Sequence, residues 1–188
     1  MTTETLIRTS PMPEEMRLLL ANYPRDDWDG HPNFRRATQN WLGAHQMFRR
    51  LSELVREDAE SYLDKETDSE VFAGRLSHFG NLLVANLHGH HNWEDREYFP
   101  ELAAADPRFE PGLDILEKDH DALDGILDDF TGQANRIIKL VQLDEKSARE
   151  EAGALHGHAT QIETLLDRHL SDEEDLAVPI ILHHKLRG

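Results

Sequence analysis

Apolar residues recur every three or four positions through four long stretches of this sequence. The stretches run over residues 34–63, 68–105, 111–143 and from Glu145 to beyond Leu176. Such spacing places the apolar side chains along one face of an α-helix. No stretch alternates between apolar and polar residues over the length of a strand. The sequence therefore predicts an all-α protein with four long helices.

The links between the predicted helices are short and polar: KETDS, ADPRFEP and QLDEKS. Short links favour antiparallel neighbours, so we expect an up-down-up-down four-helix bundle over residues 34–188. Residues 1–33 are expected to form an extension that packs on this bundle. Within it we expect a flexible segment at 1–11 and a short helix at 13–22, with Trp28 anchoring the loop that follows.

Charge and composition exclude several kinds of function. The 188 residues carry a formal net charge of −17, which makes nucleic acid and anionic membranes poor partners. Because there is no cysteine, disulfides, thiolate metal sites and cysteine nucleophiles are excluded. The N-terminus lacks the apolar core of a signal peptide, and no stretch approaches the roughly 18 apolar residues of a membrane span. We therefore expect a cytoplasmic protein with no membrane partner.

One histidine interrupts the apolar face of each predicted helix, and on two of the helices a glutamate follows four residues later. The histidines are His45, His90, His120 and His169, and the glutamates are Glu94 and Glu173. Residues four apart lie on the same helical face. Each His-x-x-x-Glu pair can therefore present an imidazole and a carboxylate to the same metal ion.

The two halves of the sequence repeat this pattern. The first histidine precedes the second by 45 residues, and the third precedes the fourth by 49. Pro100 and Pro179 each come ten residues after the histidine of a His-x-x-x-Glu pair, and we expect each to bend or end its helix just past the site. Counted from the predicted turns at about 1.5 Å per residue, all four histidines reach one level of an antiparallel bundle.

Six polar groups that point into a bundle at one level need either a complete hydrogen-bond network or a metal. Mixed imidazole and carboxylate ligands suit iron, manganese or zinc. Two carboxylates among four histidines indicate two ions bridged by Glu94 and Glu173, with two histidines on each ion. The ferritin-like arrangement requires two Glu-x-x-His motifs, and this sequence has one, at Glu117 and His120.

These residues resemble the hemerythrin-like, or HHE cation-binding, family. The resemblance covers residues 35–183 and rests on His45, the run HHNWE at 90–94 with YFP at 98–100, His120, and the run HLSDE at 169–173. It implies a four-helix bundle with a non-haem di-iron centre, oxo- or hydroxo-bridged, that reacts with O2 or related small molecules.

One position departs from the family's pattern. Oxygen-carrying hemerythrins have a second histidine one turn after the histidine of the third helix, and here that position is Asp124. Asp124 is therefore a possible further ligand, or else the ion held by His120 and His169 has an additional open position. Reversible oxygen carriage is accordingly in doubt for this sequence.

Other polar residues beside the motif are assigned smaller roles. We expect His88 to lie at the surface and His91 to lie at a helix interface or beside the ligands. Glu97 is expected at the surface, and Tyr98 is expected to pack against the bundle.

The predicted function is that of a non-haem di-iron protein that binds or reacts with O2, NO or peroxide. The cofactor expected is a pair of iron ions, with zinc and manganese as the other candidates, and the partner expected is a small diatomic or peroxide ligand. The alternative is an iron- or oxygen-sensing or metal-storage binding protein without catalytic turnover. The residues leave open whether the protein is an enzyme and which protein partner it has.

Overall fold

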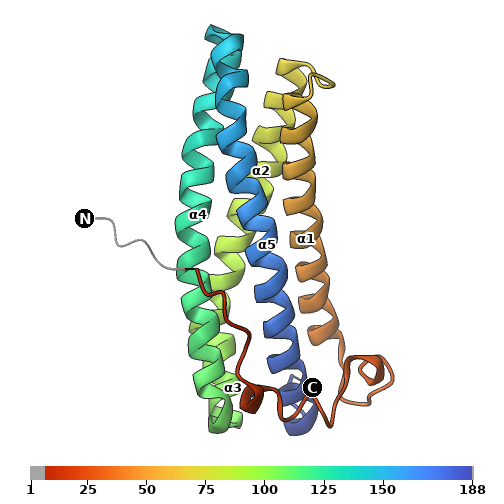
Figure 1. Ribbon diagram of the computed structural model, residues 1–188. Helices are drawn as coiled ribbons and strands as arrows, with labels where there is room; N and C mark the ends of the chain where they lie inside the picture. The colour runs from red at the N-terminus through yellow and green to blue at the C-terminus, as the bar shows by residue number, and fades with distance from the viewer. Residues whose placement is uncertain (1–6, 188) are drawn as a thin grey trace, which may run out of the picture. The chain divides into compact units, whose positions relative to one another are not determined.

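The computed structural model describes residues 7–187, and this part of the chain is helical with no strand (Figure 1). The helices are α1 (Arg36–Leu63), α2 (Ser69–Trp93), α3 (Phe99–Ala105), α4 (Glu110–Leu143) and α5 (Glu145–His184), with a π-helical turn at Glu94–Tyr98 and 3-10 turns at Glu14–Arg17, Arg25–Asp27 and Pro107–Phe109. The all-α prediction is confirmed. No helix among the described residues is long and apolar enough to cross a membrane.

A π-helical turn joins α2 to α3, so that the backbone stays helical from Ser69 to Ala105. In this turn the Phe99 N–H donates to the Glu94 carbonyl, five residues earlier. Pro100 has no N–H, and in an α-turn its ring would collide with the carbonyl four residues earlier. A π turn contains one more residue than an α turn and is often found at functional sites.

Neither of the two prolines ends its helix. The backbone continues past Pro100 through α3, and Pro179 lies inside α5. The prolines therefore do not end their helices, and the alternative expectation, that they bend them, stays a prediction. Helical hydrogen bonds on either side outweigh the one bond that each proline cannot make.

The N-terminal segment contains a shorter helix than the predicted 13–22. Only a 3-10 turn at Glu14–Arg17 forms, followed by further turns with bonds such as Leu20 N–H to the Arg17 carbonyl. Residues 1–6 of the segment expected to be flexible lie outside the described residues. Arg8 is anchored by ion pairs to Asp119 of α4 and Asp172 of α5.

The chain divides into two compact units. Unit 1 takes the described residues of 1–46, 90–121 and 167–188, and unit 2 takes 47–89 and 122–166. The predicted site residues on α1, α2, α4 and α5 all fall in unit 1, whereas Asp124 falls in unit 2.

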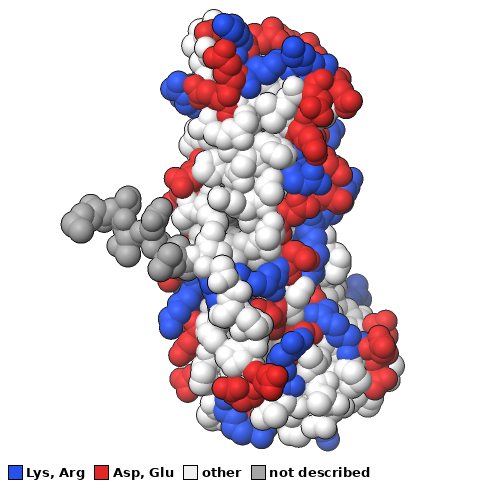
Figure 2. Space-filling view, viewed as in Figure 1, with Lys and Arg blue, Asp and Glu red and all other residues white. Residues whose placement is uncertain are grey.

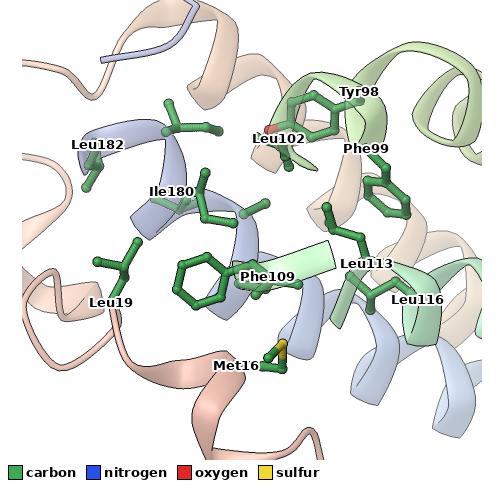
Figure 3. Packing of buried hydrophobic residues seen from close by; sticks show 14 of the residues in the cluster. Met16, Leu19, Tyr98, Phe99, Leu102, Phe109, Leu113, Leu116, Ile180 and Leu182 are labelled. Carbon is green, nitrogen blue, oxygen red and sulfur yellow. The ribbon is translucent and has the colours of Figure 1, made fainter. Parts of the chain in front are cut away.

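The core of unit 1 is an apolar cluster between the N-terminal segment and the helices α3, α4 and α5. Figure 3 shows this cluster, which includes Met16, Leu19, Phe99, Leu102, Phe109, Leu113, Leu116, Ile180 and Leu182. Gly112 allows the N-terminal segment to approach α4, because a Cβ atom there would lie 2.9 Å from the Met16 sulfur. The cluster packs α3 and α4 against α5. Helices α4 and α5 carry His120 and His169 of the predicted site.

Unit 2 is held by its own aromatic and ionic contacts. Tyr62 and Phe72 stack with ring centroids 4.2 Å apart, and the Arg149 guanidinium lies over the Tyr62 ring. Arg56 of α1 pairs with Glu163 of α5 at 2.5 Å. None of these contacts involves a residue of the predicted site.

Candidate metal centre

Four histidines meet in unit 1 as two close pairs. His45 Nε2 lies 3.1 Å from His90 Nε2, and His120 Nε2 lies 3.1 Å from His169 Nε2. The four rings come from α1, α2, α4 and α5 in that order. Three are buried, and the side chain of His90 is 10% exposed.

The Glu94 carboxylate reaches both histidine pairs. Its Oε1 lies 2.9 Å from His90 Nε2 and 4.0 Å from His45 Nε2, while its Oε2 lies 3.7 Å from His120 Nε2. The indole N–H of Trp41 donates to Oε1 at 2.7 Å. Glu94 is therefore held in place by the protein, with one oxygen facing each pair.

The Glu173 carboxylate also lies between the pairs, but without such support. Its Oε2 is 3.5 Å from His45 Nε2 and 3.8 Å from His169 Nε2. Neither oxygen forms a hydrogen bond with any residue in the described part of the chain. Glu173 is fully buried, so both of its oxygens are polar atoms without a protein partner.

Two of the imidazoles are oriented by further carboxylates. His45 Nδ1 lies 3.0 Å from Glu174 Oε1, and His120 Nδ1 lies 2.7 Å from Asp95 Oδ1. A proton on Nδ1 that is donated to a carboxylate leaves Nε2 with a free lone pair. Both rings therefore present a metal-binding nitrogen to the centre.

A family model for the hemerythrin HHE cation-binding domain matches residues 36–185. The chain belongs to the hemerythrin HHE family. The resemblance noted in the sequence is thus confirmed. Searches of curated proteins and of solved structures gave no match.

Two of the carboxylates behind the histidines of this HHE domain, Glu174 and Asp119, are paired with arginines. Arg25 Nη1 lies 2.7 Å from Glu174 Oε2, and Arg8 Nη2 lies 2.7 Å from Asp119 Oδ2. Asp119 Oδ2 is 3.8 Å from His169 Nδ1, which is longer than a hydrogen bond. Burial raises the pKa of Asp119, but His169 and Arg8 together lower it to about 2.

Sequence reasoning missed these supporting residues. The only feature of the sequence that could have pointed to them is that they are adjacent to predicted ligands. Asp95 and Glu174 directly follow the glutamates of the two motifs, and Asp119 directly precedes His120. Arg8 and Arg25 carry no signal of this kind, since their partners lie 111 and 149 residues away.

The two central carboxylates differ in charge. Burial favours the neutral form of Glu94, but His45 and His90 lower its pKa well below the usual value. Burial and the neighbouring charge of Glu94 raise the pKa of Glu173 well above the usual value. In the metal-free HHE domain these shifts favour the ionised form of Glu94 and the protonated form of Glu173.

His91 is a further buried polar group at the centre. Its ring stacks on His120 with centroids 3.9 Å apart and planes 8° apart, and it meets His169 edge-on at 5.6 Å. Neither ring nitrogen forms a hydrogen bond with a described residue. Burial, followed by the neighbouring His120 and His169, lowers the pKa of His91 well below 6.5, so the ring is neutral.

The donor set fits a pair of cations. Two groups of residues each bring their ligand atoms within 4.8 Å of one another, namely His45, His90 and Glu94, and His91, His120 and His169. Two nitrogens that each lie about 2.1 Å from one ion, at a right angle, are about 3.0 Å apart, which agrees with both Nε2 pairs. The unpartnered oxygens of Glu173 are also atoms that cations would satisfy.

The other predicted residues belong to neither group. Asp124 lies in unit 2, where its Oδ1 is 3.0 Å from His88 Nδ1, and its role as a ligand stays a prediction. The His88 side chain is 39% exposed, as expected of a surface residue. Tyr98 is buried, and its ring stacks on Trp93 at 5.0 Å.

Proposed function

We propose that this HHE domain holds two iron ions, oxo- or hydroxo-bridged, and reacts through them with O2, NO or peroxide. His45 and His90 would bind one ion and His120 and His169 the other. The bridges would be Glu94 and Glu173, because each of these carboxylates lies within 4.0 Å of a histidine from both pairs. That observation carries the proposal.

A bound iron pair supplies redox chemistry toward small oxygen- or nitrogen-containing ligands. The protein contributes orientation and the exclusion of water. Glu174 and Asp95 fix the imidazole rings, and the buried side chains of Phe99 and Leu116 form an apolar wall, with the Phe99 ring stacked on His120 at 5.5 Å. Metal binding requires the proton of Glu173 to leave, since a bridging carboxylate must be ionised.

The proposal includes the predicted context of the centre. We place it in an up-down-up-down bundle over residues 34–188, with residues 1–33 packed as an extension, in a cytoplasmic protein. The net charge of −17 and the intermingled acidic and basic side chains on the face in Figure 2 support a small ligand rather than nucleic acid.

A second candidate function is iron or oxygen sensing without turnover. It is favoured by the ion pairs of Arg8 and Arg25, which connect the N-terminal segment to the carboxylates Asp119 and Glu174 behind the histidines. Turnover of peroxide or NO by the iron-loaded protein supports the enzyme. A metal-dependent change in partner binding without turnover supports the sensor.

Metal analysis with visible spectroscopy tests the proposed centre. After iron-replete growth we expect two irons per chain, with oxo-bridge absorption in the near-ultraviolet after exposure of the reduced protein to air. We also expect the iron form to melt well above the metal-free form, because metal binds the folded cage better than the unfolded chain. One tightly bound zinc with no iron, or equal melting temperatures for the two forms, contradicts the proposal.

A further inference from the structure

Helix α2 presents two adjacent histidines to the centre, one toward each pair. His90 Nε2 lies 3.1 Å from His45 Nε2. His91 instead packs against the second pair, stacked on His120 and edge-on to His169. Neighbouring residues of a helix point about 100° apart, so a helix beside a pair of ions can offer one imidazole to each.

A purely structural role does not explain His91. A buried histidine in a protein core normally donates from one ring nitrogen and accepts at the other. His91 is 2% exposed, and neither of its nitrogens has a hydrogen-bond partner among residues 7–187. Stacking on His120 would be served equally well by an apolar ring.

The surroundings of His91 suit a metal ligand. The ligand atoms of His91, His120 and His169 lie within 4.8 Å of one another. Imidazole nitrogens are common metal ligands. A cation at this position would satisfy a nitrogen that the protein leaves without a partner.

We infer that His91 is a third nitrogen ligand to the cation that His120 and His169 hold. This inference rests on the proposed two-ion centre. The centre then has five histidines and is asymmetric, with three nitrogens on one cation and two on the other. The cation with two histidines keeps more exchangeable positions, and it lies beside His90, whose 10% exposure is the largest among the proposed ligands.

Cobalt(II) loading tests this ligand count in the whole protein. Each histidine bound to paramagnetic cobalt gives a strongly shifted proton signal from its other ring nitrogen, and nitrogen-15 labelling of histidine identifies these signals. We expect five such signals from the unmodified protein and four from His91→Phe, which keeps an aromatic ring for the stack. The control is His88→Phe, which makes the same substitution on the same helix at a histidine outside the three-histidine group. This variant should keep all five signals.

Cobalt titration gives a second measurement. His91→Phe should bind one of its two cobalt ions at least about tenfold more weakly, while its circular dichroism remains helical. Four shifted signals in the unmodified protein, or unchanged affinity and signals in His91→Phe, would overturn the inference and leave the two-ion centre standing. Failure of the unmodified protein to bind two cations would overturn the proposed function and the inference together.

Discussion

The two His-x-x-x-Glu motifs look alike in sequence and are built differently. Glu94, four residues after His90, begins a π turn and accepts a hydrogen bond from the Trp41 indole at 2.7 Å. Glu173, four residues after His169, lies within regular α5 and has no hydrogen-bond partner among the described residues. The same spacing therefore produces one carboxylate held by the protein and one without a protein partner.

This difference separates two tasks that a metal cage has to perform. In the proposed centre, an ionised Glu94 that is already fixed in position would attract and orient the first cation without any rearrangement. A protonated Glu173 avoids a second buried negative charge until metal arrives. In the proposed centre the first motif would therefore attract the metal, and the second would complete the site once Glu173 has lost its proton.

The largest effect should be the loss of paired metal when either glutamate is removed. Glu94→Ala and Glu173→Ala should each weaken binding of the metal pair by about 100-fold or more, because each carboxylate spans both histidine pairs. Glu97→Ala is the control and should retain both ions. Iron stoichiometry at limiting metal measures the effect, and equal retention in all three variants would show that the glutamates are not bridges.

A pH effect should follow from His169 in the metal-free protein. Burial lowers the pKa of His169 from 6.5 to about 4. Between these two pH values the His169 imidazole is protonated in the unfolded chain but stays neutral in the folded protein. The free energy of unfolding is therefore unaffected by this group above pH 6.5. As the pH falls from 6.5 to about 4, the free energy of unfolding decreases by about 3 kcal/mol.

Urea unfolding of the metal-free protein between about pH 7 and about pH 4.5 measures this loss. His169→Asn lacks the titrating group, so its stability should depend less steeply on pH over this interval. Equal pH dependence of the two proteins would contradict the burial of a neutral His169.

The stability of the metal-free protein should distinguish the two glutamates directly. Glu94→Ala leaves the Trp41 N–H without its acceptor, and should lower the free energy of unfolding by about 1–3 kcal/mol. Glu173→Gln replaces a protonated acid by a neutral group of the same shape, and should change it by less than about 0.5 kcal/mol. Denaturant unfolding compares them, and the opposite order would reverse the assignment of the charged carboxylate.

The smallest effect should come from the residue that holds Glu94. Trp41→Phe keeps most of the buried aromatic surface and removes the N–H donor, so metal affinity should fall by about tenfold, as is usual when a group that orients a ligand is lost. Trp28→Phe is the matched control, because its indole N–H donates to the Tyr23 carbonyl instead. Equal affinities in the two variants would show that Glu94 needs no such support.

The sequence by itself determined the helices, the family and the identity of six central residues. Helix limits follow from apolar periodicity, and the structure begins α1 at Arg36 and α4 at Glu110, within two residues of the predicted starts. Residues four apart on a helix must share a face. The meeting of His90 with Glu94, and of His169 with Glu173, was therefore a local matter that sequence could predict.

Only the tertiary structure decided what supports and completes those residues. Periodicity averages over a whole helix face and does not report the rotation of one ring, so the stacking of His91 on His120 could not be read from spacing. Hydrogen-bond partners such as Trp41 and Glu94 come from different helices, 53 residues apart. Which groups meet across such distances depends on how the side chains of all the helices pack together, and that is a property of the folded chain rather than of any local pattern.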